Sequence, residues 1–217
     1  MHSWRRTLIL TDGGLASLVA SAHAREAATL AGISPDALPS NVVLHAFVPQ
    51  PEAVLLQRKA AAVQAEVLGL GWCGNESRGL ALPAPQADEH ERECIELFGA
   101  ALLAARLGCE RVIWPASAGT SDSVDIDRLA TINDRALVAA RFASVTSQAA
   151  TATGIVIDTP FAELSDEQLA DLALDAGVPL QTCWWWAKHS DDTIVDRERA
   201  RWHTALQTAG WGAMAGV

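Results

Sequence analysis

The segment from Thr7 to Ser17 constrains the fold more than any other stretch of the chain. Its residues 7–11 are typical of a buried strand, Gly13 and Gly14 follow as a turn, and a helix is expected to begin at once. The helical spacing is carried by Leu15, Leu18, Val19 and Ala22. A strand, glycine turn and helix in succession present backbone N–H groups and the positive end of the helix dipole to an anion. The segment therefore predicts an α/β protein with a phosphate-binding turn.

Strand and helix patterns alternate along the rest of the chain. Short apolar runs, typical of strands buried in a parallel sheet, occur at Thr7–Thr11, Val42–Val48, Arg111–Pro115, Gly154–Asp158 and, more weakly, Leu68–Trp72. Amphipathic helices are expected at Glu52–Leu68, Asp88–Leu107, after Ser165 and at Arg197–Ala209. This alternation predicts an open, mainly parallel, five-stranded sheet with helices on both faces, a Rossmann-like arrangement. Ligands of such sheets bind beyond the carboxyl ends of the strands.

Capping residues mark the ends of two of these helices. Asp88 with Glu91 forms a cap pair, and the run from Ser165 to Gln168 is a capping box. Gly108 and Gly177 follow the last helical residues, as glycines do at helix C-termini.

Composition and charge narrow the classes of partner. The chain of 217 residues is long enough for one sizeable core, so 1–217 is expected to form a single domain. A net charge of −10, with no stripe of Lys and Arg, argues against nucleic-acid binding. A single nucleotide is still allowed, because it needs only a local cluster of donors. No apolar run is long enough to span a bilayer.

The cysteines and the N-terminus bear on localisation. The four cysteines are scattered and form no C-x-x-C pair: Cys73, Cys94, Cys109 and Cys183. Reduced thiols of a cytoplasmic protein are therefore expected. An alternative is export, because Trp4-Arg5-Arg6 with the later Ala22-His23-Ala24 is similar to a twin-arginine signal and its cleavage site. Asp12-Gly13-Gly14 interrupts the apolar region of that signal, which favours a core strand.

Several motifs together carry a family resemblance. Where the family has Ser-Gly-Gly-x-Asp-Ser after its first strand, this chain has Asp12–Ser17. A small apolar helix ending in Leu-Gly is matched by Phe98–Gly108. A Thr-Pro turn, a later Gly-Val-Pro and a Thr-x-Cys-aromatic segment are matched by Ile157–Pro160, Gly177–Pro179 and Thr182–Trp184. The chain thus resembles the PP-loop ATP-pyrophosphatase superfamily, and within it the 7-cyano-7-deazaguanine synthases of queuosine biosynthesis.

The resemblance implies a fold of the adenine nucleotide alpha-hydrolase type and an ATP- and Mg²⁺-dependent ligase. Such an enzyme activates a carboxylate by adenylation and releases pyrophosphate. Gly13, Gly14 and Ser17 would then hold the pyrophosphate, and Asp12 or Asp122 would hold magnesium. The expected partner is a small nucleotide or deazapurine.

The turn departs from the family pattern at two positions. Asp12 stands in place of the first Ser, and Ala16 stands in place of the Asp; in the family these residues serve pyrophosphate and magnesium. A carboxylate at Asp12 would repel phosphate oxygens about 4 Å away by roughly 4 kcal/mol at an effective dielectric near 20. One interpretation is that Asp12 caps the helix and occupies the anion site itself. The other is that it binds magnesium from a shifted position.

Residues 181–217 correspond to the zinc-binding region of the family and are expected to form a C-terminal appendage. Of the family's four cysteines only Cys183 remains, and Trp185, Trp186 and His189 stand where others would be. We expect zinc to be absent. The alternative is a site of Cys183, His189 and His203 with one carboxylate.

Two further segments are candidates for function. The acidic run Ser121–Arg128 follows a predicted strand, and its Asp122, Asp127 and Arg128 match acidic and Asp–Arg elements of the family; it is either a magnesium and nucleotide site or a surface loop that caps the next helix. The indoles of Trp184–Trp186 either stack on a purine-like ring or serve as core packing or a homodimer contact.

Three functions therefore remain open. The chain is an ATP-using relative of the deazaguanine synthases, a degenerate relative that binds a nucleotide, base or protein partner without turnover, or another α/β protein for a small ligand.

Overall fold

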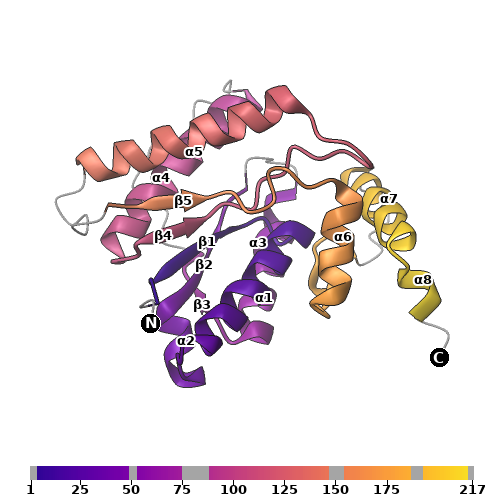
Figure 1. Ribbon diagram of the computed structural model, residues 1–217, viewed down its shortest axis with the longest axis horizontal. Helices are drawn as coiled ribbons and strands as arrows, with labels where there is room; N and C mark the ends of the chain where they lie inside the picture. The colour runs from indigo at the N-terminus through magenta and orange to yellow at the C-terminus, as the bar shows by residue number, and fades with distance from the viewer. Residues whose placement is uncertain (1–3, 49–52, 75–87, 147–153, 187–192, 215–217) are drawn as a thin grey trace.

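The computed structural model describes residues 4–48, 53–74, 88–146, 154–186 and 193–214, which are arranged around one open sheet (Figure 1). The strands are β1 (Thr7–Thr11), β2 (Val42–Ala46), β3 (Gly71–Trp72), β4 (Arg111–Ile113) and β5 (Val156–Asp158). All neighbouring strands are parallel, and their order is β3-β2-β1-β4-β5. The prediction of an open, five-stranded parallel α/β sheet is confirmed.

The central strand β1 separates two apolar clusters because successive side chains point to opposite faces. Ile9 packs with α1 (Leu15–Leu30), α3 (Val54–Leu68) and α6 (Asp166–Asp175). Leu8 and Leu10 pack with α4 (Glu89–Arg106) and α5 (Ile126–Thr146). Figure 1 shows α4 and α5 on one side of the sheet and α1, α3 and the short α2 (Leu38–Asn41) on the other. Helices therefore cover both faces, as predicted.

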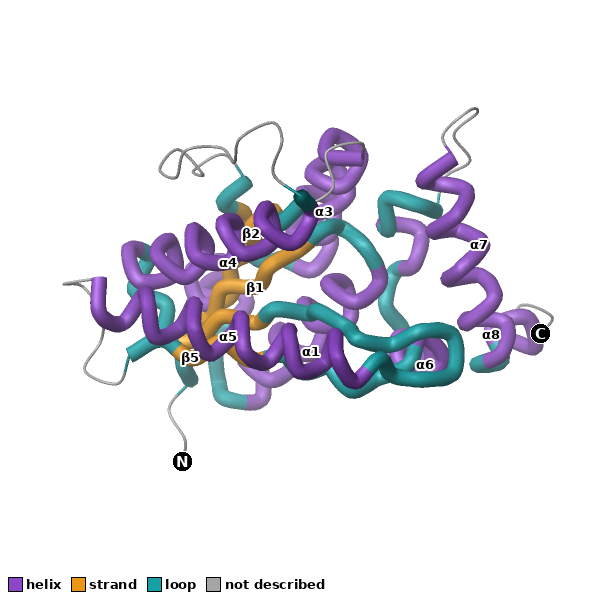
Figure 2. The backbone as a smooth tube through the Cα atoms, turned by 90° about the horizontal axis from the view of Figure 1, so that it is seen from above, coloured by secondary structure: helices purple, strands orange, loops and turns teal. Residues whose placement is uncertain are grey.

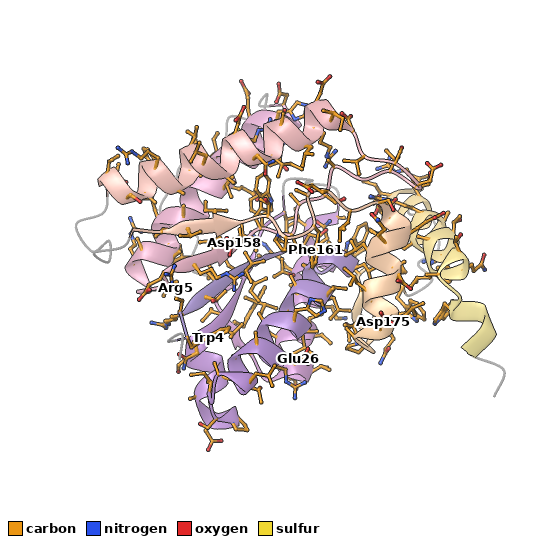
Figure 3. All side chains as sticks on the ribbon, viewed as in Figure 1. Trp4, Arg5, Glu26, Asp158, Phe161 and Asp175 are labelled. Carbon is orange, nitrogen blue, oxygen red and sulfur yellow. The ribbon has the colours of Figure 1, made fainter. Side chains whose placement is uncertain are left out.

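The last three helices lie beyond the carboxyl ends of the strands. They are α6, α7 (Thr193–Thr208) and α8 (Trp211–Met214), and Figure 2 shows α7 and α8 at one end of the molecule, away from the strands. The buried ring of Phe161 lies between β5 and α6 (Figure 3). The end of the sheet at which α/β proteins bind ligands is thus partly covered by the C-terminal part of the chain.

Local signals placed several element ends correctly. Asp88 with Glu91, and Ser165 with Gln168, form complete capping boxes at α4 and α6. Gly108 and Gly177 follow these helices with φ of 69° and 58°. Four of the five strands, β2 to β5, are shorter than predicted, and the structure gives the reason for two of them. Pro115 has no N–H to continue β4, and the N–H of Val48 donates to a carboxylate oxygen of Glu96 (2.9 Å) instead of extending β2. The last long helix begins at Thr193, before the predicted Arg197.

Two further observations concern the whole of the described chain. All four cysteines are free thiols, and Cys109 and Cys183 are buried. None of the helices within the described ranges combines the length and apolarity needed to cross a membrane.

Candidate functional site

The glycine turn lies at the point of the sheet where the direction of strand addition reverses. The chain moves from β1 outward through β2 to β3, and then returns to β4 on the other side of β1. In open parallel sheets this reversal opens a crevice at the carboxyl ends of the two central strands, where ligands bind. Asp12, Gly13 and Gly14 follow β1 directly at that edge, and Ser17 is in the first turn of α1. The structure therefore brings these four predicted residues together at the expected place.

The N–H groups of the glycine turn are bonded to side chains of the turn itself. The Gly13 N–H donates to Thr11 Oγ1 (3.0 Å), and the Gly14 N–H donates to Asp12 Oδ1 (2.8 Å). The hydroxyl of Ser17 is fully buried; it lies 3.1 Å from Thr11 Oγ1, which donates to it, and 3.0 Å from Asp12 Oδ1, to which it donates. These are the donors that a pyrophosphate in the turn would need. Because the Asp12 carboxylate already accepts from the Gly14 N–H and the Ser17 hydroxyl, and Thr11 accepts from the Gly13 N–H, the turn as folded does not fit a pyrophosphate with its magnesium.

Gly13 is pressed between α3 and the C-terminal segment. Its φ is 70°, and a Cβ placed on it would lie 2.6 Å from the carbonyl oxygen of Gln57 and 2.8 Å from the Cβ of Ala60. Its own carbonyl accepts from the side-chain amide of Gln64 (3.0 Å) and from the N–H of Trp184 (3.1 Å). Only glycine meets both the steric and the conformational demand here. The turn is thus fixed from two sides by groups far from it in the sequence.

An ion pair joins α6 to α7 near the turn. The guanidinium of Arg201 binds both carboxylate oxygens of Asp166, with Nε–Oδ2 at 2.7 Å and Nη2–Oδ1 at 2.6 Å. The Asp166 side chain is only 4% exposed, whereas that of Arg201 is 39% exposed. Arg201 also lies 3.6 Å from a carboxylate oxygen of Glu198 and 4.7 Å from the ring centre of Trp202. The one guanidinium thus serves two carboxylates and an indole face.

The negative charge of Asp12 affects two titratable groups near this ion pair, Cys183 and Glu198. Burial, and then the negative charge of Asp12, raise the pKa of the Cys183 thiol well above its usual range. Burial also raises the pKa of Glu198, where Arg201 opposes the shift and Asp12 adds to it. The buried thiol of Cys183 is therefore protonated at neutral pH, and the surroundings of the glycine turn are acidic.

Replacing Glu198 by glutamine should stabilise the protein at pH 8 and change it little at pH 5. Folding raises the pKa of Glu198, so between the pKa of the unfolded chain and that of the folded protein the folded state binds more protons. The free energy of unfolding therefore falls as pH rises through this range. Glutamine removes the buried charge but can still accept a hydrogen bond. Urea unfolding of both proteins at the two pH values measures the effect, with the exposed Glu163→Gln as control. A Glu198→Gln protein that loses more stability at pH 8 than at pH 5 would contradict the assignment.

The second group of predicted residues lies in the loop after β4. Residues 119 and 124 form an antiparallel bridge, and Asp122 is exposed within this hairpin. Asp127 and Arg128 are exposed in the first turn of α5, and the Arg128 Nε donates to the Ser117 carbonyl (3.0 Å). The capping carboxylate is that of Asp125, which accepts from the N–H groups of both Asp127 and Arg128. The cap of the next helix is thus present, and the same hairpin contacts α6 through the Asp166 N–H and the Thr120 carbonyl (2.9 Å).

These predicted groups do not assemble a metal centre in the described part of the chain. Among those residues, no three His, Cys, Asp or Glu side chains are grouped so that they could hold a metal ion. His189, one member of the alternative zinc set, lies outside the described residues. His203 packs against the rings of Trp186 and Trp211, at 5.6 Å from each ring centre.

The three consecutive tryptophans pack mainly within the protein. Trp184 and Trp185 are buried, and Trp186 is half-buried. Trp185 stacks on Trp202 of α7 with ring centres 6.5 Å apart, and Trp186 meets Trp211 of α8 edge-on at 5.4 Å. The indoles therefore fasten the C-terminal helices to one another and to the core.

The sequence did not indicate two residues that make specific contacts at this site, Gln64 of α3, which binds the Gly13 carbonyl, and Arg201 of α7, which binds Asp166. Gln64 is completely buried on a helix otherwise interpreted only by its apolar positions, and Arg201 stands in a mixed-charge helix. A glutamine on the apolar face of α3 is the one signal that could have been used, because buried amides usually have a specific partner.

Comparison with known proteins adds no family to this description. No family model matches the chain, and neither the curated proteins nor the solved structures contain a match.

Proposed function

We propose that this chain is a non-catalytic relative of the PP-loop ATP-pyrophosphatases that binds a nucleobase or nucleoside, without a triphosphate in the glycine turn. The relationship rests on the sequence motifs, together with the parallel sheet and the position of the turn after its central strand. The ligand would bind at the crevice where strand order reverses.

One observation carries the proposal: the carboxylate of Asp12 accepts from the Gly14 N–H and the Ser17 hydroxyl. It therefore stands at the N-terminus of α1, where the helix dipole would otherwise attract a phosphate. The chain supplies its own anion at that place. A second anion would have to displace it or be repelled by it.

The wider charge pattern supports the same interpretation. Asp12, Asp166 and Glu198 contribute three carboxylates to this end of the molecule, and the guanidinium of Arg201 is already engaged by two of them. A polyphosphate would meet net negative charge. A neutral or cationic ring would not be repelled by this charge, and its amino groups could donate hydrogen bonds to the carboxylates.

Calorimetric titration of the wild-type protein with adenosine, AMP, Mg²⁺–ATP and 7-deazaguanine tests the proposal. We expect saturable binding of a nucleoside or base and at least tenfold weaker binding of Mg²⁺–ATP. In Asp12→Asn, Mg²⁺–ATP should bind at least tenfold more tightly than in the wild type. The amide oxygen can still cap Gly14, while the repulsion, about 4 kcal/mol for charges 4 Å apart at a dielectric near 20, is removed.

The matched control is Asp171→Asn, which removes one exposed negative charge from α6 and leaves the turn intact. Tight binding of Mg²⁺–ATP to the wild type, with release of pyrophosphate, would overturn the proposal in favour of ATP-dependent carboxylate activation. Failure of every base, nucleoside and nucleotide to bind would instead leave a protein partner as the ligand of this relative, and would equally overturn the small-ligand proposal.

A further inference from the structure

The helix α5 carries more large exposed apolar side chains than any other helix in the described chain. Leu137 and Val145 are 70% and 69% exposed, and Val138 and Phe142 are 54% and 38% exposed. The opposite side of α5 packs on α4 and β5, so the helix lies at the outside of the molecule (Figures 1 and 2). Side chains project from it away from the sheet (Figure 3). Exposed apolar side chains gathered on one face mark an interaction surface.

Charge and apolar character on this face are arranged symmetrically about its middle. With 3.6 residues per turn, six exposed residues share one face of α5, here called the α5 face: Ala130, Asp134, Leu137, Val138, Arg141 and Val145. From the midpoint between Leu137 and Val138 towards either end of the helix, the α5 face has first an aliphatic residue, then a charged residue and then another apolar residue. The spacing is the same in both directions, and the two charges are opposite.

We propose that the α5 face binds the α5 face of a second copy of this chain, with the two helices antiparallel about that midpoint. Asp134 of each copy then lies opposite Arg141 of the other, which forms two identical ion pairs. Leu137 meets Val138 between them, and Ala130 meets Val145 outside them. A two-fold dimer requires a self-complementary surface of this kind, in which residue i contacts residue j and j contacts i.

Charge complementarity selects a second copy over an unrelated partner. Asp134 and Arg141 are both exposed, and within the described residues neither forms an ion pair. Buried beside Leu137 and Val138 in a dimer, each charge would find its counter-charge at the same depth. The 21 residues of α5 extend over about 30 Å, so the pairing has room for both ion pairs and both apolar contacts.

The test is to reverse the two charges separately, together and in mixture, with molar mass measured by sedimentation equilibrium. The wild type should dimerise, and Asp134→Arg and Arg141→Asp should each weaken dimerisation at least about tenfold, since both symmetric pairs become repulsive. The double variant Asp134→Arg/Arg141→Asp should restore it. An equimolar mixture of the two single variants should form heterodimers, because one copy is then positive and the other negative at both positions.

The mixture also controls for folding, because two variants that associate only with each other are both folded. Arg25→Asp on the exposed surface of α1 is the matched control and should leave the dimer unchanged. A wild-type protein that stays monomeric at 100 times the protein concentration of the calorimetric titrations would overturn the inference. A dimer that neither single reversal weakens would do so too, as would single reversals that neither the double variant nor the mixture rescues.

Discussion

Gly13→Ala should lower the free energy of unfolding by roughly 2 to 5 kcal/mol. Part of this loss, about 1 to 2 kcal/mol, comes from a non-glycine residue at a φ of 70°. The remainder, about 1 to 3 kcal/mol, comes from forcing a methyl group against the backbone of α3, where it would lie 2.6 Å from the Gln57 carbonyl oxygen. Urea unfolding monitored by tryptophan fluorescence and by circular dichroism measures the change.

Gly69→Ala is the matched control for this substitution. Gly69 has nearly the same backbone angle, φ 65°, but a Cβ on it would meet no atom within 4 Å. The control should therefore show only the conformational part of the loss. If the two variants lose equal stability, then the contact between the turn and α3 does not constrain position 13 as described.

Arg201→Ala should cost about 3 kcal/mol of folding stability. It leaves the carboxylate of Asp166, whose side chain is 4% exposed, without the guanidinium that binds both of its oxygens. Breaking a buried pair by removing one partner typically costs about 3 to 5 kcal/mol. We expect the lower end, because the Arg201 side chain is 39% exposed and water screens part of the interaction. Chemical denaturation at pH 7 measures it.

A second substitution separates the loss of the pair from the loss of arginine packing. In Arg201→Ala/Asp166→Asn the buried carboxylate of Asp166 is no longer left without its partner, and only Glu198 loses its contact with the guanidinium, so this protein should be more stable than Arg201→Ala alone. Arg201→Lys should lie between the wild type and alanine, because an ammonium keeps the charge but not the two parallel hydrogen bonds. A double variant that is less stable than Arg201→Ala would show that the buried carboxylate is not what the arginine serves.

The sheet could be predicted because its signals are local. The apolar run from Thr7 to Thr11, the cap of Asp88 and the capping box at Ser165 each occupy a few consecutive residues, and the structure has each where the pattern placed it. The weak strand candidate at Leu68–Trp72 became only β3, Gly71–Trp72. The length of a strand depends on its neighbours, and these are not adjacent in the sequence.

The surroundings of the turn were predicted only in part, for a related reason. That the Asp12 carboxylate would occupy the start of α1 could be proposed from its place before two glycines, as one of two interpretations. In the structure Gly14 is the N-cap residue, and Asp12 accepts from its N–H and from the Ser17 hydroxyl. The pairing of Asp166 with Arg201 could not, because Asp166 serves equally well as an ordinary acidic residue in the first turn of a helix. Which arginine reaches it depends on how α6 and α7 pack, and the helical periodicity of either sequence does not determine that packing.

The hydrogen bond from Trp184 to Gly13 has a consequence for biosynthesis. A ribosome delivers the first strand and helix long before the tryptophan whose N–H completes the turn, so until then the Gly13 carbonyl has only water or the Gln64 side-chain amide as a donor. Asp12, by contrast, emerges beside the N–H that it binds and is available during translation. The glycine turn thus has one hydrogen bond that can form as soon as the turn leaves the ribosome, and another that can form only after most of the chain has been synthesised.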